Sequence, residues 1–247
     1  MNVLDVIEVT KDFGGLRANN NISFSIRRGE LVGLIGPNGA GKTTLFNCIC
    51  GYHPVTSGRI IFYGEDITPL KAHEVARKGL ARTFQVYLAS GDLTVEENIM
   101  VGCFMRTRSR EVARGKAREI MEKLKITALA EHLVTDLPVA AQKKVSMATA
   151  LGTEPKLLLL DEVAAGLNPS EIDEIMEGIR HIHEKMGVDI ILIEHVMELV
   201  MRVSHRVIVL DSGVKIADGD PASVAADPSV IKAYLGEKFA RDQMLVK

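Results

Sequence analysis

The sequence has 247 residues, of which 47% are hydrophobic, so it has enough apolar material for one large core with an inserted lobe. Its formal net charge of -2 at pH 7 excludes the overall basic field that nucleic-acid-binding proteins usually have. Three cysteines do not indicate a disulfide framework, and Cys48 and Cys50 fit buried thiols, with metal ligation as the alternative. Met1–Asp5 lacks signal-peptide features, and no apolar run approaches the roughly 18 residues of a membrane span. We therefore expect a soluble cytoplasmic protein that can still dock on a membrane.

The N-terminal region of the chain is expected to contain both half-exposed and buried strands. Ile22–Ile26 alternates apolar and polar residues, the pattern of a strand with one wet face, which suits an antiparallel edge layer. Leu31–Ile35 is almost continuously apolar and indicates a buried strand, and an amphipathic helix is expected to open at Lys42–Phe46. The segment Gly58–Gly64 begins and ends with glycine, which predicts another short strand.

The rest of the chain divides into a helical middle and an alternating C-terminal half. From about residue 92 to residue 152 the apolar positions recur at helical spacing, which predicts an inserted helical lobe. Near-continuous apolar runs at 157–160, 189–193 and 206–210 alternate with helical patterns and predict a parallel sheet covered on both faces. Asp220-Pro221 and Asp227-Pro228 each predict the start of a helix in the tail.

These elements predict a single α/β domain composed of a core, a helical subdomain and a tail. The core is expected over residues 1–91 and 153–219, the helical subdomain over 92–152, and the C-terminal helical tail over 220–247.

One loop carries the strongest chemical signal. It matches the phosphate-binding pattern G-x-x-x-x-G-K-[ST] at every fixed position, and it lies between the predicted strand Leu31–Ile35 and a predicted helix, as the motif requires. Backbone N–H groups and the helix N-terminus would hold the phosphates, Lys42 would reach the β and γ phosphates, and the Thr43 hydroxyl would ligate Mg²⁺. The expected ligands are therefore ATP and Mg²⁺. The loop consists of Gly36, Pro37, Asn38, Gly39, Ala40, Gly41, Lys42, Thr43 and Thr44.

A second acidic site follows the apolar run 157–160. Asp161 and Glu162 come directly after it, so a buried strand would deliver two adjacent carboxylates beside the phosphates. Asp161 would orient or ligate Mg²⁺ through water, and Glu162 would polarise the water that attacks the γ phosphate. The alternative is a strand end with two solvated acids, which the upstream phosphate loop makes less favoured. The two motifs together predict ATP hydrolysis.

Nearly the whole chain resembles the ATP-binding cassette (ABC) ATPases. That resemblance implies a P-loop NTPase (RecA-like) core with a mostly parallel sheet, an antiparallel β edge layer and an inserted α-helical subdomain. It also implies that Phe13 stacks on adenine, that Gln85 contacts Mg²⁺ or water and senses the membrane partner, and that His195 contacts the γ phosphate. The alternatives are, in the same order, a core aromatic at a strand end, an ordinary exposed glutamine and a hydrogen-bonded core histidine. Ala165–Asn168 matches a loop that crosses the dimer interface in that family.

The family's signature, commonly L-S-G-G-Q, departs from its usual form here. It falls at Leu137–Gln142, before a helix expected over Lys143–Leu151, and it lacks the serine and glycine that reach the γ phosphate on the opposing subunit in that family. Pro138 has neither a hydroxyl nor an N–H group, and Ala140, followed by Ala141, carries a methyl group that restricts close approach. Losing one charge-assisted hydrogen bond costs about 1.5–3 kcal/mol. We expect an intact site in cis with slow or partner-dependent turnover.

The order of the motifs and the tail Ala233–Gly236 look like the ATPase subunits of branched-chain amino acid importers. This resemblance implies a second ATPase subunit (the same chain or a paralogue), multi-span membrane permease subunits, and indirectly a periplasmic or extracellular solute-binding protein. It implies a peripheral location on the inner face of the cell membrane. An importer of a related small solute would look much the same. The alternative function is a soluble nucleotide-gated module with weak hydrolysis that regulates a protein or nucleic-acid assembly.

A basic run lies in the expected helical subdomain. A solvated helix face explains it most simply, and attraction to anionic lipid headgroups is the alternative; nucleic acid is not an expected partner. The run consists of Arg106, Arg108, Arg110, Arg114, Lys116 and Arg118.

Overall fold

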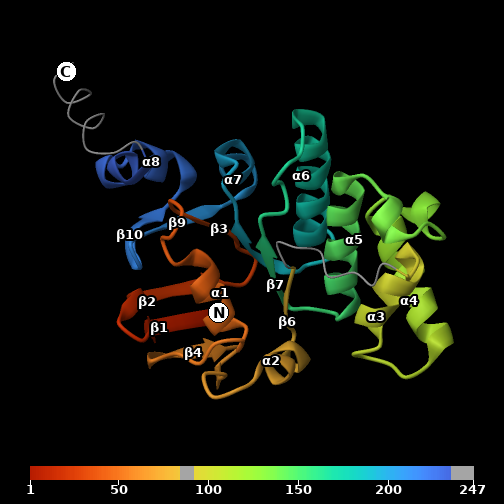
Figure 1. Ribbon diagram of the computed structural model, residues 1–247, viewed down its shortest axis with the longest axis horizontal. Coiled ribbons are helices and arrows are strands. Elements are labelled where there is room, and N and C mark those ends of the chain that lie inside the picture. Colours follow the sequence, from red (N-terminus) through yellow and green to blue (C-terminus); the bar gives the residue numbers. More distant parts are fainter. Residues whose placement is uncertain (84–91, 235–247) are drawn as a thin grey trace. The chain divides into compact units, whose positions relative to one another are not determined.

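The computed structural model describes residues 1–83 and 92–234 (Figure 1). The chain is α/β, with a mixed sheet of mostly parallel strands and a separate antiparallel sheet, so the expected fold class is confirmed. The chain consists of two compact units. The first contains Met1–Ala72 and the C-terminal region from Ile191, and the second contains His73–Ile190. The second unit includes two strands as well as the helical segment, and the division into core, helical subdomain and tail stays a prediction.

The antiparallel sheet belongs to the first unit and has the strand order β2-β1-β4-β5. Its strands are β1 (Asn2–Phe13), β2 (Leu16–Arg27), β4 (Ser57–Phe62) and β5 (Glu65–Asp66). The expected alternating strand lies within β2, where Ile22, Phe24 and Ile26 are buried. In the register of the sheet, Phe24 faces Val6 across the β1–β2 ladder. This layer thus has one apolar and one solvent-facing side, as the period-two pattern predicts.

The buried strands of the first unit are β3 (Leu31–Ile35) and β9 (Arg206–Asp211), which pair in parallel, while β9 pairs antiparallel with β10 (Val214–Gly219). Two helices, α7 (Met197–Val203) and α8 (Pro221–Ala226), contribute to the core of this unit. Because the last residue of β3 belongs to the core, the start of the loop that follows β3 is rigidly anchored. The core cluster consists of Ile35, Val200, Val207, Val209, Val224 and Val230.

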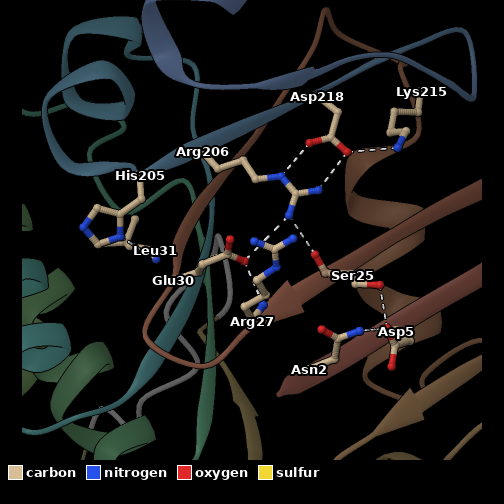
Figure 2. A network of polar contacts seen from close by, with 10 residues as sticks. All are labelled: Asn2, Asp5, Ser25, Arg27, Glu30, Leu31, His205, Arg206, Lys215 and Asp218. Carbon is tan, nitrogen blue, oxygen red and sulfur yellow. Dashed lines mark hydrogen bonds and ion pairs between the residues drawn. The ribbon is translucent and has the colours of Figure 1, made fainter.

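A network around Arg206 ties the strands of this unit together (Figure 2). Arg206 donates from Nε and Nη2 to the two carboxylate oxygens of Asp218 at 2.6 and 2.9 Å, and from Nη1 to the carbonyl oxygen of Ser25 at 2.9 Å. Lys215 Nζ also donates to Asp218, at 2.9 Å. Burial alone would raise the pKa of the Asp218 carboxyl, but the hydrogen bonds from Arg206 and Lys215 lower it overall. The network therefore depends on an ionised carboxylate.

The second unit contains two parallel strands and a group of helices. Strand β6 (Leu80–Arg82) pairs with β7 (Leu157–Asp161), and β8 (Asp189–Ile193) contains the boundary between the units. The short strand β6 was not predicted from the sequence. The helices are α3 (Val95–Cys103), α4 (Arg110–Lys123), α5 (Val139–Gly152) and α6 (Pro169–Glu184), with short 3₁₀ turns at Thr127–Leu129 and Val134–Asp136. A further helix, α2 (Ala72–Lys78), begins at the boundary.

The helical segment expected between about 92 and 152 is confirmed by α3, α4 and α5 (Figure 1). Helices α3 and α5 touch through their backbones. A Cβ atom added to Gly102 would lie 2.1 Å from the carbonyl oxygen of Thr149, and one added to Gly152 would lie 2.9 Å from the nitrogen of Cys103. Only glycine therefore fits at these two crossing points.

Side-chain caps define where several helices begin. Asn168 accepts a hydrogen bond from the N–H group of Glu171, whose carboxylate accepts one from the N–H group of Asn168, and Pro169 opens α6. This is a capping box with proline at the first helical position. In the tail, Asp220 caps α8 as expected, and residues 228–234 are helical, so both predicted helix starts are confirmed.

Several cations of the basic run are held by ion pairs. Arg114 and Arg118 on α4 each place Nε 2.7 Å from a carboxylate oxygen of Glu96 on α3, whose side chain is only 7% exposed. Lys116 pairs with Glu154. The expected solvated helix face is therefore only partly correct, because these cations hold α4 to its neighbours.

Two further expectations concern cysteines and membrane spans. Cys48, Cys50 and Cys103 are buried and form no disulfide within the described part of the chain, and burial raises the pKa of Cys48 to about 11. Among the described residues no group of side chains has the composition of a metal cluster. Within residues 1–83 and 92–234 no helix is both long and apolar enough to cross a bilayer.

Candidate active site

The predicted phosphate loop connects β3 to α1 (Lys42–Ile49), as the motif requires. Three glycines have positive φ: 150° at Gly36, 81° at Gly39 and 94° at Gly41. A Cβ atom at Gly36 would lie 2.0 Å from the carbonyl oxygen of Leu210, so the loop passes directly against β9. These glycines are therefore required for backbone geometry, and they turn the loop around the start of α1.

The polar side chains of the loop differ in burial, and Lys42 is the most deeply buried of them. Lys42 is 5% exposed, and its Nζ donates to the carbonyl oxygens of Gly36 at 2.7 Å and of Pro37 at 3.0 Å. Thr43, in the first turn of α1, is exposed, as are Asn38 and Gly39. No side chain caps this helix N-terminus among the described residues, so its first N–H groups and the Lys42 ammonium form an anion-binding geometry.

The β1–β2 hairpin lies against the loop. Asn19 is fully buried in β2 and donates from Nδ2 to the carbonyl oxygen of Gly41 at 3.0 Å. Phe13, at the end of β1, is 43% exposed, lies edge-on to His53 with ring centroids 5.4 Å apart, and has Lys11 Nζ 4.7 Å from its ring centroid. The interpretation of Phe13 as a strand-end core aromatic is therefore wrong, and its ring has a face that a base could stack on.

The C-terminal helix also reaches the loop. Burial raises the pKa of the Tyr234 hydroxyl, and a hydrogen bond with the backbone of Gly36 acts in the opposite direction. Val230, one turn earlier, belongs to the core cluster with Ile35. The tail is thus packed onto the strand that leads into the loop.

In the second unit, Asp161 ends β7 and is 1% exposed, as expected for a strand that delivers a carboxylate from a buried sheet. Its Oδ2 accepts a hydrogen bond from Arg82 Nη2 on β6, and its backbone N–H group donates to Thr83 Oγ1 at 3.1 Å. Its Oδ1 is buried and has no hydrogen-bond partner among the described residues. A buried carboxylate oxygen of this kind suits a hydrated cation, because oxygen ligands are those that Mg²⁺ prefers.

Glu162 follows Asp161 and is partly exposed, so its carboxylate can reach solvent. Its φ of 49° is in the left-handed region, which a residue with a Cβ atom adopts at a cost of about 1–3 kcal/mol. Lys143 Nζ on α5 donates to the carbonyl oxygen of Glu162 at 3.0 Å and so helps to hold this backbone conformation. The interpretation of Asp161 and Glu162 as two solvated acids is wrong for Asp161.

His195 lies in the first unit, just after β8. It is exposed, and its backbone N–H group donates to Oε2 of the buried Glu194 at 3.3 Å, so the interpretation as a core histidine is wrong. Gln85 lies outside the described residues. The loop Ala165–Asn168 is mostly exposed and leads into the capping box of α6.

The altered signature does not precede a helix beginning at Lys143. Helix α5 begins at Val139 instead, with Pro138 as its N-cap and no side-chain cap from the residues that the structure describes. Ala140 and Ala141 are therefore in the first turn of α5. The physical reason is that alanine has the highest helix propensity.

The structure places the predicted residues in two sets, one in each compact unit. Phe13, the loop from Gly36 to Thr44 and His195 belong to the first unit, and Asp161 and Glu162 belong to the second. The sequence analysis missed Asn19, Arg82, Thr83 and Lys143, which orient these groups. In the sequence, Arg82 is only a charged residue directly after two apolar residues. This pattern indicates a buried arginine only once the strand is known.

Comparison with known proteins decides the family. The sequence matches the family described as ABC transporter over residues 19–165, which is more than half of the chain. It is 38% identical to the high-affinity branched-chain amino acid transport ATP-binding protein BraF of Pseudomonas aeruginosa, over 95% of this chain and 98% of that protein. The chain belongs to the ABC transporter family. The resemblance that the motifs predicted is thereby confirmed.

A further relative and a second family model both concern branched-chain amino acid transport. The chain is 39% identical to LivG of Salmonella typhimurium, a high-affinity branched-chain amino acid transport ATP-binding protein, over 91% of this chain and 94% of that protein. Residues 214–240 match a second family, described as branched-chain amino acid ATP-binding cassette transporter.

Solved structures of ABC cassettes agree with the fold. A nucleotide-free ATP-binding cassette from an ABC transporter has a TM-score of 0.88 and 30% sequence identity, covering 96% of this chain and 100% of that one. The ADP conformation of an ABC transporter cassette gives a TM-score of 0.87 and 31% identity with the same coverage.

Proposed function

We propose that this chain is the ATP-hydrolysing subunit of an ABC importer for branched-chain amino acids or a related small solute. It would dimerise on ATP, with a second copy or a paralogue, and drive membrane permease subunits from the cytoplasmic face of the cell membrane. The permease would receive its solute from a separate binding protein outside. The relatives named as branched-chain amino acid transport ATP-binding proteins support this choice of solute.

One observation carries the proposal: the phosphate loop has the backbone that nucleotide binding needs. Three glycines with positive φ surround a helix start that no described side chain caps, and Lys42 is buried inside the loop. Backbone N–H groups and the Lys42 ammonium would bind the phosphates, and Phe13 would stack on adenine.

The chain's own residues also fit Mg²⁺. Thr43 is an exposed residue at the start of α1, and Asp161 has a buried carboxylate oxygen without a hydrogen-bond partner among the described residues. These two residues, with Gln85, would hold the ion, which when bound neutralises charge on the phosphates. Glu162 would act as the general base by accepting a proton from the attacking water, and His195 would orient the γ phosphate.

Glu162→Gln tests this function. The amide cannot accept the proton but leaves the phosphate loop unchanged, so the variant should bind ATP, hydrolyse it at least about 100-fold more slowly than wild type, and remain as an ATP-bound dimer. Dimer formation is measured by light scattering with ATP and Mg²⁺, and hydrolysis by phosphate release. Glu177→Gln is the matched control, because Glu177 is 69% exposed and pairs at the surface with Lys125. Hydrolysis by Glu162→Gln at the control's rate would contradict the role of Glu162.

Copurification separates the two classes of function. Recovery of the full-length protein with a multi-span membrane protein supports transport. A stable soluble complex without any membrane protein would favour the nucleotide-gated module instead. The match of residues 214–240 to a transporter family supports the first outcome.

A further inference from the structure

We propose that Arg82 is a positioning residue that holds the Asp161 carboxylate so that only one of its oxygens is available to the metal. The inference rests on the proposed function, because it assumes that Asp161 acts on the Mg²⁺ that accompanies ATP. Arg82 itself would touch neither the nucleotide nor the ion.

The contact between the two side chains is deeply buried. Arg82 Nη2 donates to Asp161 Oδ2, and the two side chains keep only 6% and 2% of their exposed surface. A buried ion pair is weak evidence for a role in stability, since replacing both charges is often neutral, whereas removing one leaves the other uncompensated. The guanidinium group also fixes direction as well as charge, because its N–H groups form a rigid planar fork.

Thr83, the residue directly after β6, fixes the backbone of Asp161. Thr83 Oγ1 accepts a hydrogen bond from the N–H group of Asp161 at 3.1 Å, and the N–H group of Thr83 donates to the carbonyl oxygen of Leu159 at 2.9 Å. Arg82 faces Leu159 in the parallel β6–β7 register. The last residue of β6 and the residue after it thus hold both the side chain and the main chain of Asp161, which leaves the carboxylate little rotational freedom.

The two carboxylate oxygens then have different tasks. Oδ2 is occupied by Arg82, whereas Oδ1 is buried without a hydrogen-bond partner among the described residues. An unpaired buried oxygen is unfavourable unless a ligand completes its shell. Outer-shell partners that orient a ligand in this way usually change metal affinity by about 10- to 100-fold when they are lost.

Two effects of removing Arg82 oppose each other, and their balance makes the proposal testable. Loss of a positive charge would strengthen the attraction of the site for a cation, whereas loss of the anchor would let the carboxylate rotate out of the orientation that offers Oδ1 to the metal. Positioning predicts that the second effect is larger. Arg82→Met removes both charge and fork, and Arg82→Lys keeps the charge without the fork.

The experiment measures Mn²⁺ affinity of the full-length protein in the presence of ATP, by electron paramagnetic resonance of free Mn²⁺. Affinity for a fluorescent ATP analogue in EDTA is measured beside it. We expect Arg82→Met to weaken Mn²⁺ binding about 10-fold, Arg82→Lys to weaken it less, and both to bind the metal-free analogue as wild type does. In an Asp161→Asn background the Arg82→Met change should have little further effect. Arg202→Met, at a surface ion pair with Glu198, is the matched control.

Other results would overturn the proposal. Unchanged or tighter Mn²⁺ binding by Arg82→Met would show that Arg82 does not orient the carboxylate. An equal loss of Mn²⁺ affinity in the Asp161→Asn background, or an equal loss of metal-free nucleotide binding, would show a merely structural role. Failure of the wild-type protein to bind the analogue at all would instead overturn the proposed ATPase function, which distinguishes the two failures.

Discussion

Replacing Gly36 by alanine should destabilise this protein more than the same change at Gly39, although both glycines lie in one loop and have positive φ. A Cβ atom at residue 36 would lie 2.0 Å from the carbonyl oxygen of Leu210 and 3.1 Å from Cβ of Ala40. At residue 39 it would meet no atom of residues 1–83 or 92–234 within 4 Å. The first substitution therefore adds a steric overlap with β9 to the backbone strain that both substitutions share.

The magnitude follows from these two contributions. An alanine held at positive φ costs about 1–3 kcal/mol, which applies to both variants. The overlap at residue 36 cannot be relieved by a side-chain rotation, since the contacted atom is backbone, and such overpacking costs about 1–3 kcal/mol more. We therefore expect Gly36→Ala to lose roughly 2–6 kcal/mol of unfolding free energy and Gly39→Ala roughly 1–3 kcal/mol.

Urea unfolding followed by circular dichroism, without nucleotide, measures this difference. With an m-value of about 2 kcal/mol per molar urea, the midpoint of Gly36→Ala should lie roughly 0.5–1.5 M below that of Gly39→Ala. The absence of nucleotide matters because both changes would also alter phosphate binding, and bound ligand would add its own stabilisation. If Gly39→Ala unfolds at the same urea concentration as Gly36→Ala, or lower, the argument from the contact with Leu210 is refuted.

Two further predictions concern a helix cap and an ion pair. Asn168→Ala should lower the unfolding free energy by about 1 kcal/mol, because it removes the capping box of α6, and a thermal melt beside wild type should show this loss. The pKa of Asp218 lies below its ordinary value of 3.8, so its contribution to stability is fully present above that pH and is lost as pH falls through the lower folded pKa. Asp218→Asn should therefore melt below wild type at pH 7, and this gap should narrow as the pH falls below 3.8; a gap that is independent of pH would contradict the ion-pair argument.

The sequence predicted the buried strands well because their signal is local. Leu31–Ile35 and Asp189–Ile193 have the expected bounds, and β7 and β9 each extend only one residue beyond the predicted run. Continuous apolar runs bounded by polar residues leave little choice of structure. The capped helix start at Asp220 was likewise visible in a pair of residues.

Other features depend on tertiary contacts and were not visible in the sequence. Strand β6 has only three residues and ends on an arginine, so no periodicity marks it. Helix α5 begins earlier than expected because Ala140 and Ala141 have high helix propensity. The prediction had instead placed a signature loop there. Among the site residues, those in motifs were found, whereas Asn19 and Lys143 were missed because each orients a group more than 15 residues away in the chain. The role predicted for Gln85 stays a prediction.

The backbone contact between α3 and α5 limits how the helical segment can move. With Gly102 against Thr149 and Gly152 against Cys103, a slide of one helix along the other by a fraction of a turn would drive side chains into main-chain atoms. We therefore expect the two helices to move together as one rigid body. A displacement of the exposed residues Val101, Phe104 or Met105 near the end of α3 would therefore move α5 as well. Lys143 on α5, and the peptide of Glu162 that it holds, would move with it.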